Sequence, residues 1–148
     1  MPSPVRPSTG RVLLAGLFLM VFGYLWYGVL FQQLQLDSHG YTAADYAGNS
    51  PLWYAGGGLI SLVIAIGLAL MVRADGAVWA LAGARSGVRA SLCFGLPLVS
   101  YPFVYSPHHE FGLYVVGVAH IVIGWTTAGA ILGGAAASGA TSPSPAQA

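Results

Sequence analysis

The sequence predicts an all-α integral membrane protein built as a four-helix bundle. Charged residues make up 6% of the 148 residues, whereas a soluble globular domain carries about 25%. Hydrophobic residues make up 56%, and the mean hydropathy is +0.72. The chain also contains four apolar stretches of roughly 20 residues, the length of helix that crosses a bilayer. So few charges could not cover the surface of a small soluble domain, which excludes a soluble enzyme.

The four expected membrane spans cover residues 12–31, 52–72, 86–105 and 111–133. The third is the least regular, because it carries Arg89 near its start and contains Pro97 and Pro102. An arginine near a helix end can reach the lipid headgroups, and membrane helices tolerate proline where neighbours satisfy the backbone. We interpret this segment as a kinked span, with a re-entrant segment as the alternative. Residues 76–82 either extend this helix or lie in the membrane interface.

The distribution of positive charge predicts the orientation of the spans. The cationic residues of the chain are Arg6, Arg11, Arg73, Arg85 and Arg89. None lies in the two other connections, residues 37–50 and 106–110. With four spans, every arginine is on the side of the N-terminus, so the positive-inside rule places both termini in the cytoplasm. A three-span protein with its C-terminus outside is the alternative.

Short polar or small-residue tails flank the expected membrane domain, which covers residues 11–134. Residues 1–10 and 135–148 are rich in Pro, Ser, Thr and small residues, a composition typical of disordered tails. The first apolar run is longer than a signal-peptide core and lacks a cleavage site of small residues, so we expect a retained helix. We therefore predict a multi-pass protein of the bacterial cytoplasmic membrane, with the lipid bilayer as its surroundings.

His120 is the principal candidate functional residue, because an ionisable side chain inside a membrane span points to a function. It lies about 13 Å below the expected outer boundary of its span. Ser61 and Tyr24 lie at similar depths, so the three residues could form a polar layer inside the bundle. Such a layer could be hydrogen-bonded packing, a proton-handling or ligand site, or one half of a haem site. Haem held by two histidines would need a second chain, and we expect no cofactor.

Aromatic residues gather where the spans meet the expected outer surface. This group comprises Trp26, Tyr27, Trp53, Tyr54, Tyr101 and Tyr114. Amphipathic rings settle at the membrane–water interface, so an anchoring belt is one interpretation. The other is an aromatic mouth that receives a lipid or another apolar ligand.

The expected outer connections contain residue types that bind metals. They are Asp37, His39, Asp45, His108, His109 and Glu110. Because adjacent histidines in a short loop cannot easily share one ion, we expect a solvated loop and no metal. In this interpretation the negative charge of Glu110 stabilises the positive N-terminal end of the last helix. The single cysteine, Cys93, is expected to act as a small apolar side chain in the third span.

Small residues mark a packing face on the last span. Gly117, Gly124, Gly129 and Gly133 recur at helical spacing, and the last two form a Gly-x-x-x-Gly motif. The motif indicates close helix packing, either within the bundle or in a homodimer.

Two segments resemble a known family. The first span ends in Gly23-Tyr24-Leu25-Trp26-Tyr27 followed by Phe31, and the last runs from Gly112-Leu113-Tyr114 to Gly129-Ala130-Ile131-Leu132-Gly133. Both stretches resemble the domain-of-unknown-function 1761 family of small bacterial membrane proteins. The likeness covers residues 11–134. It implies a four-helix membrane protein and no particular activity.

No motif in the sequence predicts an enzyme. The spans contain no acidic residue, and the chain has neither a Gly-rich phosphate loop nor a Ser-His-Asp order in a soluble segment. The net charge of +1 excludes nucleic acid as a partner. We expect a non-enzymatic accessory subunit or a binder of a small apolar ligand or lipid, with a homodimer or a membrane protein as possible partner. The alternatives are a proton-sensitive transporter or channel acting as a homo-oligomer, and a redox protein sharing haem between protomers.

Overall fold

The computed structural model describes residues 7–42, 44–45, 50–106 and 110–134, apart from the side chains of Pro51 and Trp53. In chain order the elements are α1 (Thr9–Leu25), a π-helical segment (Trp26–Leu30), α2 (Gln32–His39), α4 (Pro51–Ala74), α5 (Ala80–Ala90), a second π-helical segment (Ser91–Gly95), α6 (Leu96–Tyr105) and α7 (Phe111–Gly133). Thr9–Leu30, Tyr54–Ala74, Ala80–Tyr105 and Phe111–Gly133 are long and apolar enough to cross a membrane. The structure thus confirms an all-helical fold with four candidate spans, and it shows no strand in the ranges it describes.

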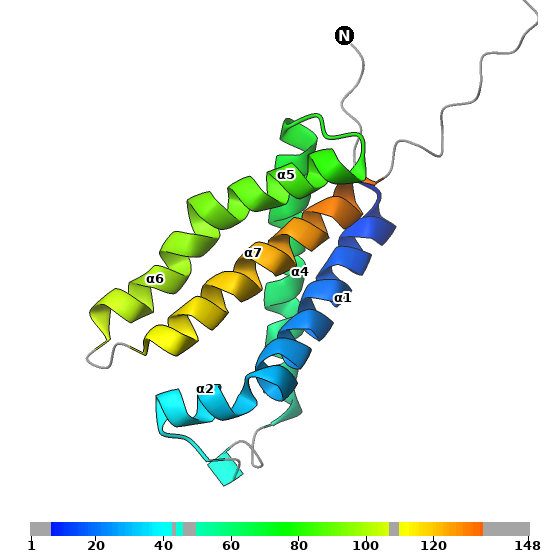
Figure 1. Cartoon of the computed structure of the whole chain (residues 1–148). Helices are drawn as coiled ribbons and strands as arrows, with labels where there is room; N and C mark the ends of the chain where they lie inside the picture. Colours follow the sequence, from blue (N-terminus) through cyan, green and yellow to red (C-terminus); the bar gives the residue numbers. More distant parts are fainter. Residues whose placement is uncertain (1–6, 43, 46–49, 107–109, 135–148) are drawn as a thin grey trace, which may run out of the picture.

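The long helices pack side by side into a bundle with two distinct ends (Figure 1). The start of α1, the α4–α5 connection and the end of α7 lie at one end, which we call the arginine end. There Arg11 Nη1 donates a hydrogen bond of 3.2 Å to the Ile131 carbonyl oxygen, and a cation stabilises the negative end of a helix dipole. The opposite end, which we call the α2 end, holds α2 and the start of α7. That the arginine end faces the cytoplasm stays a prediction.

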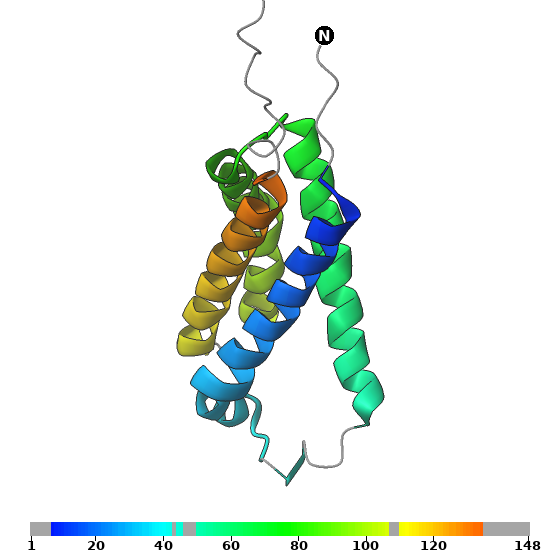
Figure 2. The same cartoon turned by 90° about the vertical axis from the view of Figure 1, so that its right-hand side faces the viewer.

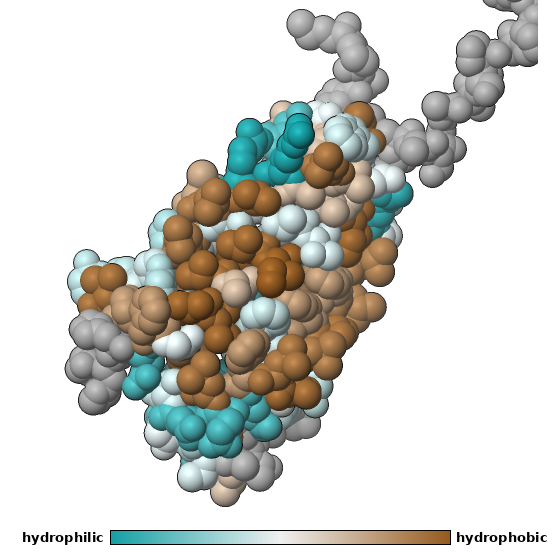
Figure 3. Space-filling model, viewed as in Figure 1, coloured by the Kyte–Doolittle hydropathy of each residue, from teal (hydrophilic) through white to brown (hydrophobic). Residues whose placement is uncertain are grey.

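The outer surface of the bundle is apolar between two polar ends. Figure 3 shows a brown hydrophobic band flanked by teal regions at the arginine end and the α2 end. Large apolar side chains of the long helices, such as Leu17, Leu59 and Leu98, are more than half exposed. Exposed leucines in so broad a band would be unfavourable in water but suit contact with lipid. The surface therefore indicates a multi-pass membrane protein.

The buried core lies in the half of the bundle nearest the arginine end. It comprises Ala15, Leu19, Ala65, Leu68, Ala69, Val72, Ala77, Ala90, Ala128 and Leu132. Small side chains predominate, so the helices of this half approach one another closely.

The third spanning helix begins at Ala80, six residues before the expected start at Ser86. Residues 80–85 thus extend the helix, because Gly83 packs against the last turns of α7. From Ala80 the helix continues without a break for 26 residues to Tyr105, long enough to cross a membrane; the kink stays a prediction. Its π-helical segment closes with the Leu96 N–H bonded to the Ser91 carbonyl oxygen, directly before Pro97, which has no N–H to donate.

Helix α2 lies across the end of the bundle and was not predicted (Figure 1). It follows the first span after a sharp turn at Phe31 (φ −119°, ψ 23°). It ends at Gly40, whose left-handed conformation (φ 68°) lets the Tyr41 N–H bond to the Leu36 carbonyl oxygen at 2.9 Å. Leu34 packs beside Gly112 at the start of α7. The helix therefore covers part of the α2 end.

Candidate functional site

A π-helical turn at the end of α1 directs two successive aromatic residues toward α7. The turn closes with the Phe31 N–H donating to the Trp26 carbonyl oxygen at 2.9 Å. A π-turn shifts the rotation of the helix, and such turns often occur at functional sites. Trp26 Nε1 donates to the Val116 carbonyl oxygen at 3.2 Å, and the Tyr27 ring lies 4.8 Å from the His120 ring. The turn thus fixes both residues against the middle of α7.

Three aromatic side chains of α1 and its π-turn hold the His120 ring. Phe22 stacks on it almost in parallel, with ring centroids 5.1 Å apart and planes at 4°. Tyr27 and Trp26 lie at 4.8 Å and 6.0 Å. Nevertheless, the buried Nε2 of His120 has no hydrogen-bond partner among the described residues. Leaving a buried polar atom unpaired costs about 1–3 kcal/mol, so such an atom in a native protein calls for an explanation.

His120 lines a cavity of about 520 Å³ between α1, α4 and α7, which we call the His120 cavity. Ser61 and Tyr24 line the same cavity, so the structure brings the three residues of the predicted polar layer together. Ser61 Oγ, however, donates to the Gly57 carbonyl oxygen of its own helix at 2.9 Å. The remaining wall is apolar or small except for Tyr54: Leu19, Met20, Val21, Gly23, Tyr54, Gly57, Ile60, Ile64 and Trp125. The three residues therefore share a cavity, but Ser61 is paired with its own helix, whereas His120 Nε2 is unpaired.

Gly23 lies directly beside His120 Nε2. A Cβ placed on Gly23 would lie 3.6 Å from Nε2 and would meet no other described atom within 4 Å outside its own stretch of helix. Gly23 also lines the cavity. This glycine therefore sets how closely a molecule in the cavity can approach the unpaired nitrogen.

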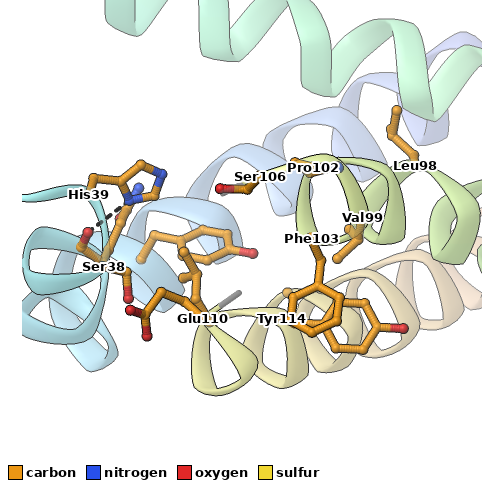
Figure 4. Close-up of a pocket in the computed structure, with 13 residues that line it drawn as sticks. Ser38, His39, Leu98, Val99, Pro102, Phe103, Ser106, Glu110 and Tyr114 are labelled. Carbon is orange, nitrogen blue, oxygen red and sulfur yellow. Dashed lines mark hydrogen bonds between the residues drawn. The ribbon is translucent and has the colours of Figure 1, made fainter. Parts of the chain in front are cut away.

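A second cavity, of about 390 Å³, lies at the α2 end (Figure 4). We call it the α2-side cavity. It is bordered by α2, α6, the start of α7 and Tyr27. Phe103 stacks on Tyr114 with ring centroids 4.6 Å apart, and the Tyr114 hydroxyl lies 3.2 Å from Ser100 Oγ. Tyr27 lines this cavity while His120 lines the other, so their ring contact lies between the two.

The family of the chain follows from a comparison with protein-family models. The model described as "Protein of unknown function (DUF1761)" matches residues 11–133. The chain belongs to this family. The match confirms the resemblance drawn from the ends of the first and last spans. No curated protein and no solved structure matches the chain.

In this DUF1761 protein the aromatic residues of the predicted anchoring belt or mouth lie in different places. Trp26 and Tyr27 point into the bundle, Tyr114 lines the α2-side cavity and Tyr54 lines the His120 cavity. Tyr101 is 65% exposed and its ring contacts only its helix neighbour Tyr105 among the ring pairs of the described residues. The side chain of Trp53 lies outside the described part of the chain. The described aromatic residues of this group therefore lie at two separate cavities, against His120 or on the outer surface.

The packing glycines of α7 contact three different elements, α5, α1 and α6. A Cβ on Gly133 would lie 2.8 Å from Gly83 Cα, and one on Gly129 would lie 3.1 Å from Gly87 Cα. Gly124 and Gly117 instead face Phe22 and Val99. The Gly-x-x-x-Gly motif of α7 thus packs against a second such motif, Gly83-x-x-x-Gly87. Sequence reasoning missed this second motif, although its spacing was visible.

The predicted metal-type residues do not gather into a site within the described structure. His39 Nδ1 donates to the Gln35 carbonyl oxygen at 2.9 Å, and Asp37 Oδ1 accepts from Gln33 at 2.7 Å. Asp45 accepts from the Thr42 N–H at 2.6 Å, and this bond lowers the pKa of its carboxyl group. The described residues contain no group of three or more His, Cys, Asp or Glu that could hold a metal. His108 and His109 lie outside those residues.

Proposed function

We propose that this protein binds a small apolar molecule with one hydrogen-bonding group, taken up from the lipid into the His120 cavity. The observation that carries this proposal is the buried, unpaired Nε2 of His120 beside an apolar space of about 520 Å³. Small-molecule sites have this character, with volumes of about 300–1,000 Å³, mostly apolar walls and a few placed polar groups.

The position of the cavity favours a ligand that arrives through the bilayer. Helices α1 and α4 diverge toward the α2 end (Figure 2), and the cavity lies between them. Tyr24 and Ile60, which line it, are 64% and 62% exposed on the surface that faces lipid. A molecule dissolved in the membrane could therefore reach the cavity without crossing water.

The histidine ring selects a ligand with a polar group. A neutral imidazole offers one N–H donor and one acceptor nitrogen, and the tautomer decides which of them is Nε2. A hydroxyl group can satisfy either form, because it both donates and accepts. The ligand would satisfy an atom that is otherwise unpaired, whereas an alkane of the same length would leave it so.

Quenching of tryptophan fluorescence by brominated alkyl probes tests this proposal, since Trp125 lines the cavity. We expect the protein in lipid nanodiscs to bind 10-bromodecanol about tenfold more tightly than 1-bromodecane, the gain of one good hydrogen bond. His120→Leu should abolish this preference. Gly23→Ala should weaken alcohol binding, because its Cβ would occupy the space beside Nε2.

Gly67→Ala is the matched control for Gly23→Ala. A Cβ on Gly67 would meet no described atom within 4 Å, and Gly67 does not line the cavity. Thermal unfolding of each variant shows that it is folded. Equal binding of the two probes by the unmodified protein would refute the proposal, as would a preference that survives His120→Leu.

A second candidate function, proton-sensitive transport, is favoured by the contact between Tyr27 and His120. Their rings lie 4.8 Å apart, between a cavity at the α2 end and one open toward lipid. A movement of this pair would join the two spaces. Transport would appear in proteoliposomes as a pH-dependent flux lost in His120→Ala, whereas simple binding produces no flux.

A further inference from the structure

The α2-side cavity carries the charge of a single carboxylate. Glu110 is the acidic residue in its lining, beside the neutral polar groups of Gln35 and Ser38 and the imidazole of His39. The chain contains five arginines and no lysine, and none of the five lies in residues 12–72 or 90–148. These two ranges supply every residue that lines the cavity. Glu110 therefore gives the lining a negative charge, and a cation is the charge that it favours.

The carboxylate of the α2-side cavity lies at one end, and the deeper part holds apolar groups beside the Tyr27 hydroxyl. Glu110 and Ser38 lie at the α2 end, with the Glu110 carboxylate on the side of α2 (Figure 4). Val99 and Gly117 line the deeper part, toward the centre of the bundle. Along α7 the distance from Glu110 to Gly117 is about 10 Å. The cavity thus suits an elongated molecule with a polar head and an apolar body.

Aromatic rings lie between these two ends. Tyr27, Phe103 and Tyr114 all line the cavity, and Phe103 and Tyr114 are stacked on each other. The face of an aromatic ring attracts an ammonium group within about 6 Å of its centroid. A carboxylate together with several rings is the combination that recognises an organic ammonium ion.

We propose that the α2-side cavity binds a monovalent organic cation, an ammonium head attached to an apolar body. Glu110 balances the charge, the rings of Phe103 and Tyr114 contact the head, and Val99 and Gly117 surround the body. A phospholipid headgroup fits less well, because its phosphate would have no lysine or arginine to pair with. This site is separate from the His120 cavity and does not depend on the function proposed for it.

Benzyltrimethylammonium, a soluble ion of this type, is a suitable probe. Calorimetric titration of the protein in uncharged dodecyl maltoside micelles should show saturable binding. Benzenesulfonate and benzyl alcohol, which carry a negative charge and no charge, should bind at least tenfold more weakly. Equal binding of the three compounds would refute the proposal.

Two substitutions in the lining, Glu110→Gln and Phe103→Leu, test whether the cation binds in the α2-side cavity. Glu110→Gln should weaken binding of the cation roughly tenfold, by removal of one nearby charge. Asp37→Asn is the matched control, because it removes a carboxylate of the same end that does not line the cavity. Phe103→Leu keeps an apolar side chain but removes a ring, and should weaken binding about threefold.

The same titrations distinguish this site from the His120 cavity. Binding of benzyltrimethylammonium should fall less in His120→Leu than in Glu110→Gln, because His120 contacts Tyr27 but does not itself line the α2-side cavity. Equal losses in Glu110→Gln and Asp37→Asn would show only a general charge effect and would overturn the proposal. A loss in His120→Leu as large as that in Glu110→Gln would also overturn it. Thermal unfolding of each variant excludes misfolding as the cause.

Discussion

The two halves of the bundle are packed in opposite ways. Near the arginine end, α5 and α7 meet through glycines whose backbones are so close that a Cβ on Gly83 would lie 2.8 Å from Gly133 Cα. Toward the α2 end, α1 and α4 diverge and leave the His120 cavity between them (Figure 2). The buried core lies in the first half and both cavities border the second. One half therefore fixes the fold, and the other has space for a ligand.

The role of glycine differs between the halves. Gly83, Gly87, Gly129 and Gly133 are buried and each faces the backbone of a neighbouring helix. Gly57 and Gly67 of α4 are exposed and have open space where a side chain would be. Only the first group permits a close approach of backbones, which maximises van der Waals contact between membrane helices.

The largest expected effect is that of Gly87→Val, which disrupts the closely packed half near the arginine end. A Cβ on Gly87 would lie 2.9 Å from Thr126 Cα, so α5 and α7 must separate. We expect a loss of about 3 kcal/mol or more in the free energy of unfolding. Denaturant titration in mixed micelles measures it. Gly57→Val, on the open surface of α4, is the control and should change this free energy by less than about 1 kcal/mol; similar losses in both variants would contradict the comparison.

An intermediate effect is expected at the α4–α5 connection, which lies at the arginine end, beside the tightly packed half (Figure 1). Asp75 accepts a hydrogen bond from the buried Ser86 hydroxyl and pairs with Arg89. These contacts, the Ser86 bond first, hold the pKa of the Asp75 carboxyl group below its usual value of 3.8. Because the Arg89 side chain is 61% exposed, we expect Asp75→Asn to lower the free energy of unfolding by only about 1 kcal/mol at neutral pH.

The pH dependence of this effect has a defined sign. A carboxyl group whose pKa is lower in the folded protein stabilises the fold above its unfolded pKa. For Asp75 this stabilisation is complete above about pH 5 and is lost as the pH falls through the lowered pKa. The unfolding free energies of the unmodified protein and Asp75→Asn should therefore converge in acid. A difference that stays constant down to pH 2 would assign the effect to packing.

The smallest expected effect is that of Gly67→Ala, on the exposed surface of α4. Gly67 lies inside α4 with open space at its Cβ position. Alanine there should raise the free energy of unfolding by about 0.5 kcal/mol, because it reduces the conformational freedom of the unfolded chain. Thermal unfolding measures the change. A decrease instead would show that this surface of α4 packs against another chain.

Much of the candidate site could be predicted from composition and depth, but its contacts could not. The rarity of an ionisable residue inside a span was enough to single out His120, and helical rise placed Ser61 and Tyr24 near its depth. The hydrogen bonds of such a layer depend on how each helix is rotated. The structure turns Ser61 Oγ to its own backbone and surrounds His120 with Phe22, Trp26 and Tyr27 instead.

The sequence alone determined the four membrane-spanning helices and the family. Both depend on local properties, namely the number of consecutive apolar residues and short motifs such as Gly129-Ala130-Ile131-Leu132-Gly133. Tertiary structure decided that this motif packs on Gly83 and Gly87, and that the two halves of the bundle differ in density. It also decided that a π-turn directs Trp26 and Tyr27 onto His120. The physical reason is that apolar residues suit lipid and protein equally well, so hydropathy shows that a helix lies in the membrane but not which neighbour each of its faces meets.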